Sequence, residues 1–98
     1  MILRLVQTEK EAEFSVRGKI DIIADILDVA KTECRKTRIM YACNLSFRQL
    51  RVYVDFLVKR GFLTLSNAEA KTGQNLRTSK RGLDFLKAYQ SLQAVISS

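Results

Sequence analysis

Apolar residues recur three and four positions apart between residues 16 and 30, the spacing that places them on one face of an α-helix. Ser15 or Gly18 can cap this helix, which we expect to run to about Lys31. Its predicted core stripe consists of Val16, Ile20, Ile23, Leu27 and Ala30. Further apolar residues widen the apolar arc of the helix beyond this stripe; they are Ile22, Ile26 and Val29. They predict that the helix also covers the N-terminal segment or a partner. The acids on the opposite face have the spacing of a solvated helix surface; they are Asp21, Asp25 and Asp28.

A polar connection at residues 32–36 leads to a shorter second helix. We expect Thr37 to cap this helix, which covers residues 38–43. Asn44 tolerates the left-handed backbone conformation that ends a helix. Leu45 is then expected to fill the turn with its apolar side chain.

The third helix has a clear start and a clear end. Ser46 has the side chain of an N-cap, and Gln49, three residues on, completes a capping box. Gly61 is a C-terminal stop. The predicted buried stripe consists of Phe47, Leu50, Val54, Leu57 and Val58. A short helix, a polar break and a longer helix in this order form a helix-turn-helix unit.

Two short strands are predicted at residues 62–65 and 75–78, and the polar segment 66–73 between them is typical of a hairpin tip. Ser79 is expected to cap a last helix that reaches about Ile96. The predicted fold is therefore mainly α, of the α+β class: a winged helix-turn-helix with a three-helix core, a two-stranded wing and a C-terminal helix. A chain of 98 residues suits one domain, residues 1–98, with an N-terminal extension at 1–14 and the C-terminal helix at 79–96.

The last helix carries two apolar stripes and one glycine. Leu83 and Leu86 are expected to face the domain core, and Gly82 to permit close packing of the helix on the domain. A second stripe follows the alternating four-and-three spacing of a coiled coil; it consists of Phe85, Tyr89, Leu92 and Ile96. It predicts a homodimer interface, with help from the first helix. The alternative is that the stripe packs on its own domain.

Positive charge is concentrated after residue 34. Residues 1–34 hold five basic and seven acidic residues, a net charge of −2, whereas residues 35–98 hold twelve basic and three acidic, a net charge of +9. Because clustered positive charge attracts polyanions, this segregation favours a nucleic-acid partner.

Several classes of site are not expected. Two cysteines without histidine exclude a zinc site of ordinary spacing, and Cys34 and Cys43 are expected to be free thiols. Without histidine, a glycine-rich phosphate loop, or a nucleophile beside a base, we expect no enzyme, no cofactor and no small-molecule substrate. The chain shows no signal peptide and no apolar run of about 20 residues, so we expect a cytoplasmic, nucleoid-located protein and no membrane partner.

The motifs themselves resemble a known family. The run KTRIMYACNLS at residues 36–46, with SKRG at 79–82, resembles the small archaeal winged-helix DNA-binding proteins of the chromatin-associated type. The resemblance covers residues 17–90. It implies DNA binding by the third helix and the wing, and an antiparallel dimer through the last helix.

Roles in DNA binding follow from residue chemistry. The residues expected to reach base edges, from the exposed face of the third helix, are Ser46, Arg48, Gln49 and Val52. Those expected to contact phosphates are Lys36, Thr37, Arg38 and Arg51. Lys71, at the wing tip, is expected to enter a minor groove, with Arg77 on its phosphates.

Two other functions remain open from the residues alone. A protein-interaction winged helix would use Val52, Tyr53 and Phe56 as an apolar docking surface, although the charge asymmetry speaks against it. RNA binding usually needs aromatic residues on an open platform, and none is evident. We therefore expect double-stranded DNA as the partner, for either a transcriptional regulator or a nucleoid-associated protein.

Overall fold

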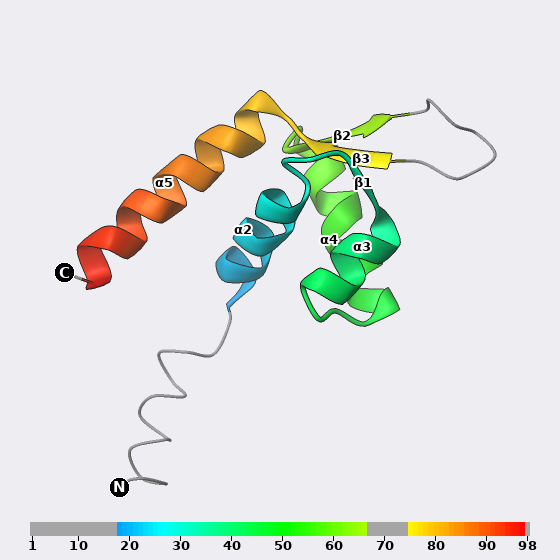
Figure 1. The fold of residues 1–98 in the computed structure, drawn as a ribbon, viewed down its shortest axis with the longest axis horizontal. Helices are drawn as coiled ribbons and strands as arrows, with labels where there is room; N and C mark the ends of the chain where they lie inside the picture. Colours follow the sequence, from blue (N-terminus) through cyan, green and yellow to red (C-terminus); the bar gives the residue numbers. More distant parts are fainter. Residues whose placement is uncertain (1–17, 67–74, 98) are drawn as a thin grey trace, which may run out of the picture.

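A computed structural model describes residues 18–66 and 75–97 of the chain. Figure 1 shows α3 and α4 grouped beneath a small sheet on one side of α2, with α5 on the other side of α2. Within the described residues, the elements in chain order are α2 (Lys19–Val29), β1 (Cys34–Arg35), α3 (Lys36–Ala42), α4 (Phe47–Lys59), β2 (Leu63–Ser66), β3 (Asn75–Thr78) and α5 (Lys80–Ser97). This arrangement confirms the predicted winged-helix fold.

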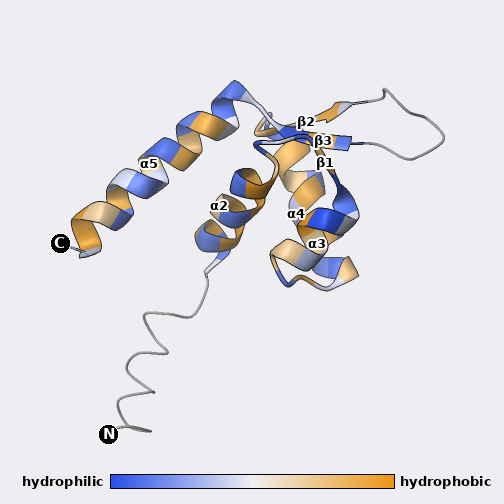
Figure 2. Cartoon of the chain, in the orientation of Figure 1, coloured by the Kyte–Doolittle hydropathy of each residue, from blue (hydrophilic) through white to orange (hydrophobic). Residues whose placement is uncertain are grey.

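The core forms where α2, α3, α4 and the sheet meet. Hydrophobic positions alternate with hydrophilic ones along α2 and α4 (Figure 2), as expected of helices that bury one face. Burying one such aliphatic side chain contributes about 1.5–3 kcal/mol relative to leaving it exposed, so this cluster supplies much of the stability. The side chains that are almost fully buried include Ile26, Leu27, Ile39, Leu50, Leu57, Leu63 and Leu76.

Two helix-start residues predicted to lie in the core are exposed. Ile20 is 54% exposed and Phe47 is 64% exposed. Each lies in the first turn of its helix, beyond the part that other elements cover. Conversely, Ile22 and Ile26 are buried within the domain because α2 contacts α5 as well as α3 and β3. The broad apolar arc of α2 therefore serves intradomain packing, while Val16 lies outside the described residues.

The turn between α3 and α4 matches the sequence prediction in detail. Asn44 has a positive φ of 56°, and Leu45 is buried, with its N–H donating to the Met40 carbonyl at 2.9 Å. The Gln49 N–H donates to Ser46 Oγ at 3.1 Å, and the Ser46 N–H donates to Gln49 Oε1 at 2.9 Å. This capping box satisfies two backbone donors that would otherwise lack partners, and it sets the direction in which α4 leaves the turn.

The sheet has three strands in the order β1-β3-β2, one more than the two-stranded wing that was predicted. Cys34 pairs with Leu76 and Arg35 with Asn75, antiparallel to β3. Because β1 holds Arg35 extended, with φ −86° and ψ 161°, Arg35 is the N-cap and α3 begins at Lys36. The predicted cap at Thr37 is therefore wrong, since Thr37 lies inside the first turn.

α5 packs closely on the domain at its start. The Ser79 hydroxyl donates to the Gly61 carbonyl at 2.6 Å and accepts from the Gly82 N–H at 3.1 Å, which confirms the predicted cap. A Cβ atom on Gly82 would lie 2.4 Å from the Phe62 carbonyl oxygen, so the predicted role of this glycine in close packing is confirmed. Leu86 is buried as expected, but Leu83 is 41% exposed, which contradicts its assignment to the core.

The predicted coiled-coil stripe of α5 divides into two parts. Phe85 and Tyr89 pack against the core, and the Tyr89 hydroxyl donates a hydrogen bond to Asp21 Oδ1 on α2. Leu92 and Ile96, by contrast, are 57% and 72% exposed. The first half of the stripe therefore belongs to the domain, and only the second half is left for another contact.

None of the helices described is long and apolar enough to cross a membrane.

Candidate nucleic-acid interface

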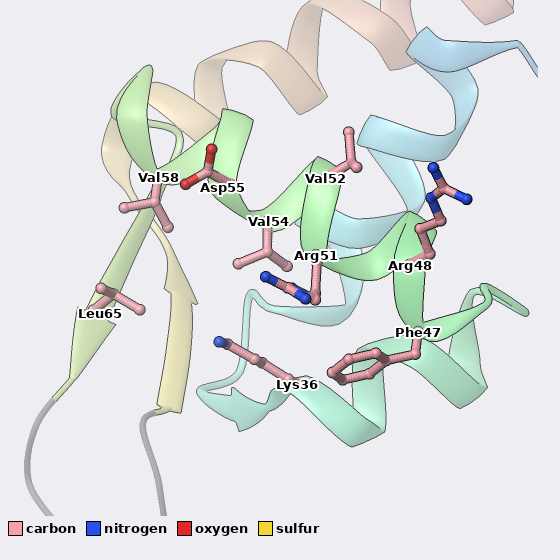
Figure 3. Close-up of a pocket in the computed structure, with 9 residues that line it drawn as sticks. All are labelled: Lys36, Phe47, Arg48, Arg51, Val52, Val54, Asp55, Val58 and Leu65. Carbon is pink, nitrogen blue, oxygen red and sulfur yellow. The ribbon is translucent and has the colours of Figure 1, made fainter.

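A groove runs along the exposed face of α4, between the start of α3 and strand β2 (Figure 3). Residues three and four positions apart on α4 share this face because the helix repeats every 3.6 residues. We call it the α4 groove; it is lined by Lys36, Phe47, Arg48, Arg51, Val52, Val54, Asp55, Val58 and Leu65. It combines the third helix and the wing strand, the two elements that were expected to form the binding surface.

The electrostatics of the α4 groove favour an anionic ligand. Among the described residues that line it, three side chains are cationic, Lys36, Arg48 and Arg51, and one is acidic, Asp55. The Asp55 carboxylate is paired with Lys59, with 3.1 Å between Oδ2 and Nζ. The acid is therefore offset by a neighbouring cation, and the surface keeps an excess of positive charge.

The cations are spread across the width of α4. Figure 3 shows Lys36 and Arg51 pointing into the space between Phe47 and β2, while Arg48 points away from them on the other edge of the helix. The guanidinium carbon of Arg51 lies 5.9 Å from the centre of the Phe47 ring, a cation–π contact that restrains the arginine. Two sides of a bound polyanion can therefore meet positive charge at once.

Of the residues expected to read bases, only Arg48 and Val52 line the α4 groove. Ser46 and Gln49 are exposed, but the capping box uses the Ser46 hydroxyl and the Gln49 side-chain carbonyl. Their free donors, the serine O–H and the amide NH₂, remain chemically able to bond at the start of α4.

The residues expected to bind phosphates lie around the groove. Lys36 and Arg51 line it, whereas Thr37 and Arg38 are exposed in the first turn of α3 without lining it. Arg77 is exposed on β3, opposite Thr64 of β2, and the Thr64 hydroxyl donates to the Arg77 carbonyl at 3.1 Å. Lys71, the predicted wing-tip contact, lies outside the described residues.

Sequence reasoning missed two apolar walls of the groove, Phe47 and Leu65. Phe47 was assigned to the core because it fits the helical stripe, and Leu65 was placed only in the short strand 62–65, with no role in a site. One signal was available for Phe47: an arginine four residues later, at the spacing that lets two side chains on a helix touch. No such signal marked Leu65, since β2 meets α4 only in the tertiary structure.

The two cysteines lie outside the α4 groove, and both are buried thiols that form no disulfide, as expected. Burial raises the pKa of the Cys34 thiol, although the positive charge of Arg38 opposes this shift. The neutral thiol is therefore favoured near pH 7. No group of three or more potential ligands among residues 18–66 and 75–97 is placed to hold a metal ion.

Two relatives match half of this chain. The uncharacterized protein MJ0287 of Methanocaldococcus jannaschii is 46% identical over 48 residues, which cover 48% of this chain and 50% of that protein. The uncharacterized protein MJ0290 of the same organism is 44% identical over 48 residues, which cover 48% of this chain and 23% of that protein. The matched part thus spans about half of the first relative and about a quarter of the second.

Two solved structures share the fold. Sso10a-2, described as a DNA-binding protein from Sulfolobus solfataricus, superposes with a TM-score of 0.73 at 22% identity, covering 83% of each chain. A MarR family transcriptional regulator from Silicibacter pomeroyi superposes with a TM-score of 0.65 at 13% identity, covering 94% of this chain and 63% of the other. Both likenesses are similarities of fold.

The sequence profile of one family extends over nearly the whole chain. The profile described as winged helix-turn-helix matches residues 16–97. This range contains all four described helices and all three described strands. The kinship suggested by the motifs at 36–46 and 79–82 is thereby confirmed, and the chain belongs to the winged helix-turn-helix family.

Proposed function

We propose that this protein binds double-stranded DNA, with α4 in the major groove and the wing on the backbone or in an adjacent minor groove. The observation that carries the proposal is the α4 groove, where Lys36, Arg48 and Arg51 surround the exposed face of the helix that follows the turn. An α-helix with its side chains is about 10–12 Å wide, which fits the roughly 12 Å width of the major groove of B-DNA.

The three cations take different roles in this arrangement. Arg48 lies in the first turn of α4, where recognition helices contact base edges, and its guanidinium can bond guanine through two hydrogen bonds. Lys36 and Arg51, on the wing side, are suited to phosphates. Arg77 extends the phosphate contacts along the wing, and Thr37 and Arg38 extend them along α3. Lys71 is proposed to reach an adjacent minor groove.

The descriptions of the two solved structures support the proposal. Sso10a-2 is described as a DNA-binding protein, and the second structure as a transcriptional regulator. A regulator and a nucleoid-associated protein would use the same surface, and they differ in how strongly they prefer one DNA sequence over another.

We also propose a homodimer through the second half of α5. Leu92 and Ile96 are exposed on one helix, an apolar surface that the domain does not cover. Ile22 and Val29 were the residues expected to assist the contact from the first helix. Ile22 is buried within the domain, and Val29 is only partly buried and is the one left to assist. Two copies joined in this way would present two recognition helices to one duplex and raise the avidity.

The proposal is tested by titrating the protein with specific-candidate and random duplexes at several salt concentrations. If roughly 5 to 8 phosphates are contacted, the logarithm of the affinity should fall linearly with the logarithm of the salt concentration, with a slope of about −4 to −7. Lys71→Ala should weaken binding to all sequences alike. A nearly flat salt dependence would contradict DNA binding and would favour the protein-interaction alternative.

A further inference from the structure

The exposed face of α4 carries two large apolar side chains among its cations. Phe47 is 64% exposed and Val52 is 63% exposed, and both line the α4 groove. Burying apolar surface stabilises a protein by about 25 cal/mol per Å², so neither residue contributes to the fold what it would contribute in the core. Their position is better explained by a ligand that covers them.

The charge around these two side chains restricts what that ligand can be. Phe47 lies beside Lys36 and Arg51, and Val52 follows Arg51 on the same helix, one turn beyond Arg48. An apolar peptide or a second copy of this basic surface would have to bring its own negative charge to bury these cations. Duplex DNA supplies the negative charge and, at one kind of base, an apolar group.

That apolar group is the C5-methyl of thymine. In the major groove the four bases present donors and acceptors, and thymine also presents a methyl group. Phe47 and Val52 are the first and sixth residues of α4, about 1.4 turns apart, so they lie about 140° apart around the helix with Arg48 and Arg51 between them. If α4 lies in the major groove of DNA with its arginines towards the DNA, both apolar side chains reach base edges.

We infer that Phe47 and Val52 read the C5-methyl groups of thymine, so that the preferred substrate is a duplex with thymines on the major-groove face that α4 covers. The inference rests on the proposed DNA binding and adds the chemistry by which one base is distinguished. Phe47 acts directly on the methyl group and also restrains Arg51 through the 5.9 Å cation–π contact, so apolar recognition and phosphate binding share one side chain.

The experiment compares two duplexes that differ only at their thymine positions. One duplex carries thymidine at all of these positions, and the other carries deoxyuridine at all of them. The two differ only in the C5-methyl groups, and their phosphate charge and base-pair hydrogen bonds are the same. Each methyl group buried on binding should tighten the complex about 4-fold, the ratio that corresponds to about 0.8 kcal/mol. We expect the wild-type protein to prefer the thymine duplex by about 4-fold to 16-fold, for one or two contacted methyl groups.

The variants assign that preference to the two side chains. The preference should fall to about one in the double variant Phe47→Ala, Val52→Ala, because the alanines no longer reach the methyl groups. Phe56→Ala is the matched control: Phe56 is an exposed phenylalanine of the same helix, stacked under Arg60 at 5.1 Å, and it does not line the α4 groove. Its preference for thymine should equal that of the wild type.

The outcomes separate this inference from the proposed function. A steep salt dependence with equal affinity for the two duplexes would overturn the thymine contact and leave DNA binding intact. A preference that persists in the double variant would assign it to duplex shape and would also overturn the inference. A flat salt dependence with weak binding to both duplexes would overturn DNA binding itself.

Discussion

Replacing Gly82 with alanine tests how closely α5 is packed on the domain. The added Cβ would lie 2.4 Å from the Phe62 carbonyl oxygen and 2.5 Å from Thr78 Cγ2. Neither neighbour is free to move, because the Phe62 carbonyl accepts from the Ser79 N–H at 3.0 Å and the Thr78 hydroxyl donates to the Leu27 carbonyl at 2.6 Å. Ordinary van der Waals contact begins at 3.4 Å, so α5 must shift by about 1 Å.

Two effects of opposite sign compete in this variant. Alanine has a higher helix propensity than glycine, by about 1 kcal/mol in a helix interior, and this effect alone would stabilise the protein. Overpacking in a dense region costs about 1–3 kcal/mol, and the shift of α5 also strains the Ser79 cap, which bonds both the Gly61 carbonyl and the Gly82 N–H. We expect the steric cost to win, with a net loss of about 1–2 kcal/mol in the free energy of unfolding.

Thermal and urea denaturation followed by circular dichroism measure this loss. For a domain of this size, each 1 kcal/mol lowers Tm by about 4–8 °C. Wild type and variants are compared at one protein concentration, because a dimer makes Tm depend on concentration. Ser91→Ala, at an exposed position of the same helix, is the control and should leave Tm unchanged or slightly raised. A Gly82→Ala protein as stable as the wild type would refute the close-packing argument.

Three further predictions concern function, assembly and the contact between α2 and α5. Arg48→Ala should weaken DNA binding by about 1–3 kcal/mol in a fluorescence titration, whereas Asp25→Asn on α2 should leave it nearly unchanged; equal losses would mean that the binding face is misassigned. Replacing Leu92 and Ile96 together with glutamate should give a folded monomer that binds DNA more weakly, and light scattering showing a wild-type monomer at high concentration would refute the dimer. Tyr89→Phe should lower the free energy of unfolding by about 1 kcal/mol, because the partly exposed hydrogen bond to the carboxylate on α2 is lost. That hydrogen bond raises the pKa of Tyr89 from 10.0 to about 12. The hydrogen bond's contribution to the free energy of unfolding is therefore complete below pH 10 and lost as the pH rises towards 12. A stability difference between wild type and Tyr89→Phe that stays constant over this range would contradict the role given to this hydrogen bond.

Local signals in the sequence determined the helix-turn-helix. The capping box of Ser46 and Gln49, the positive φ of Asn44 and the positive φ of Gly61, 79°, all match their expected roles. Each depends on atoms within about four residues of the chain, so the information lies in the neighbouring sequence. The same holds for the Ser79 cap at the start of α5.

Burial at the helix starts could not be determined in this way. Periodicity shows which side chains share a face, but it does not show how far along the helix another element covers that face. Ile20 and Phe47 fit the apolar stripes of α2 and α4 and are nevertheless exposed. As a result, Phe47 was assigned to the core although it lines the candidate DNA-binding groove.

The sequence by itself therefore determined the order of the elements, the turn at Asn44 and the charge segregation that points to DNA. Only the tertiary structure decided three other features: the pairing of β1 with β3, the groove between α4 and β2, and the division of the α5 stripe after Tyr89. The physical reason is the separation along the sequence of the residues that interact. Caps and turns are made by adjacent residues, whereas Cys34 pairs with Leu76 across 42 positions, and the Tyr89 hydroxyl bonds Asp21 across 68 positions.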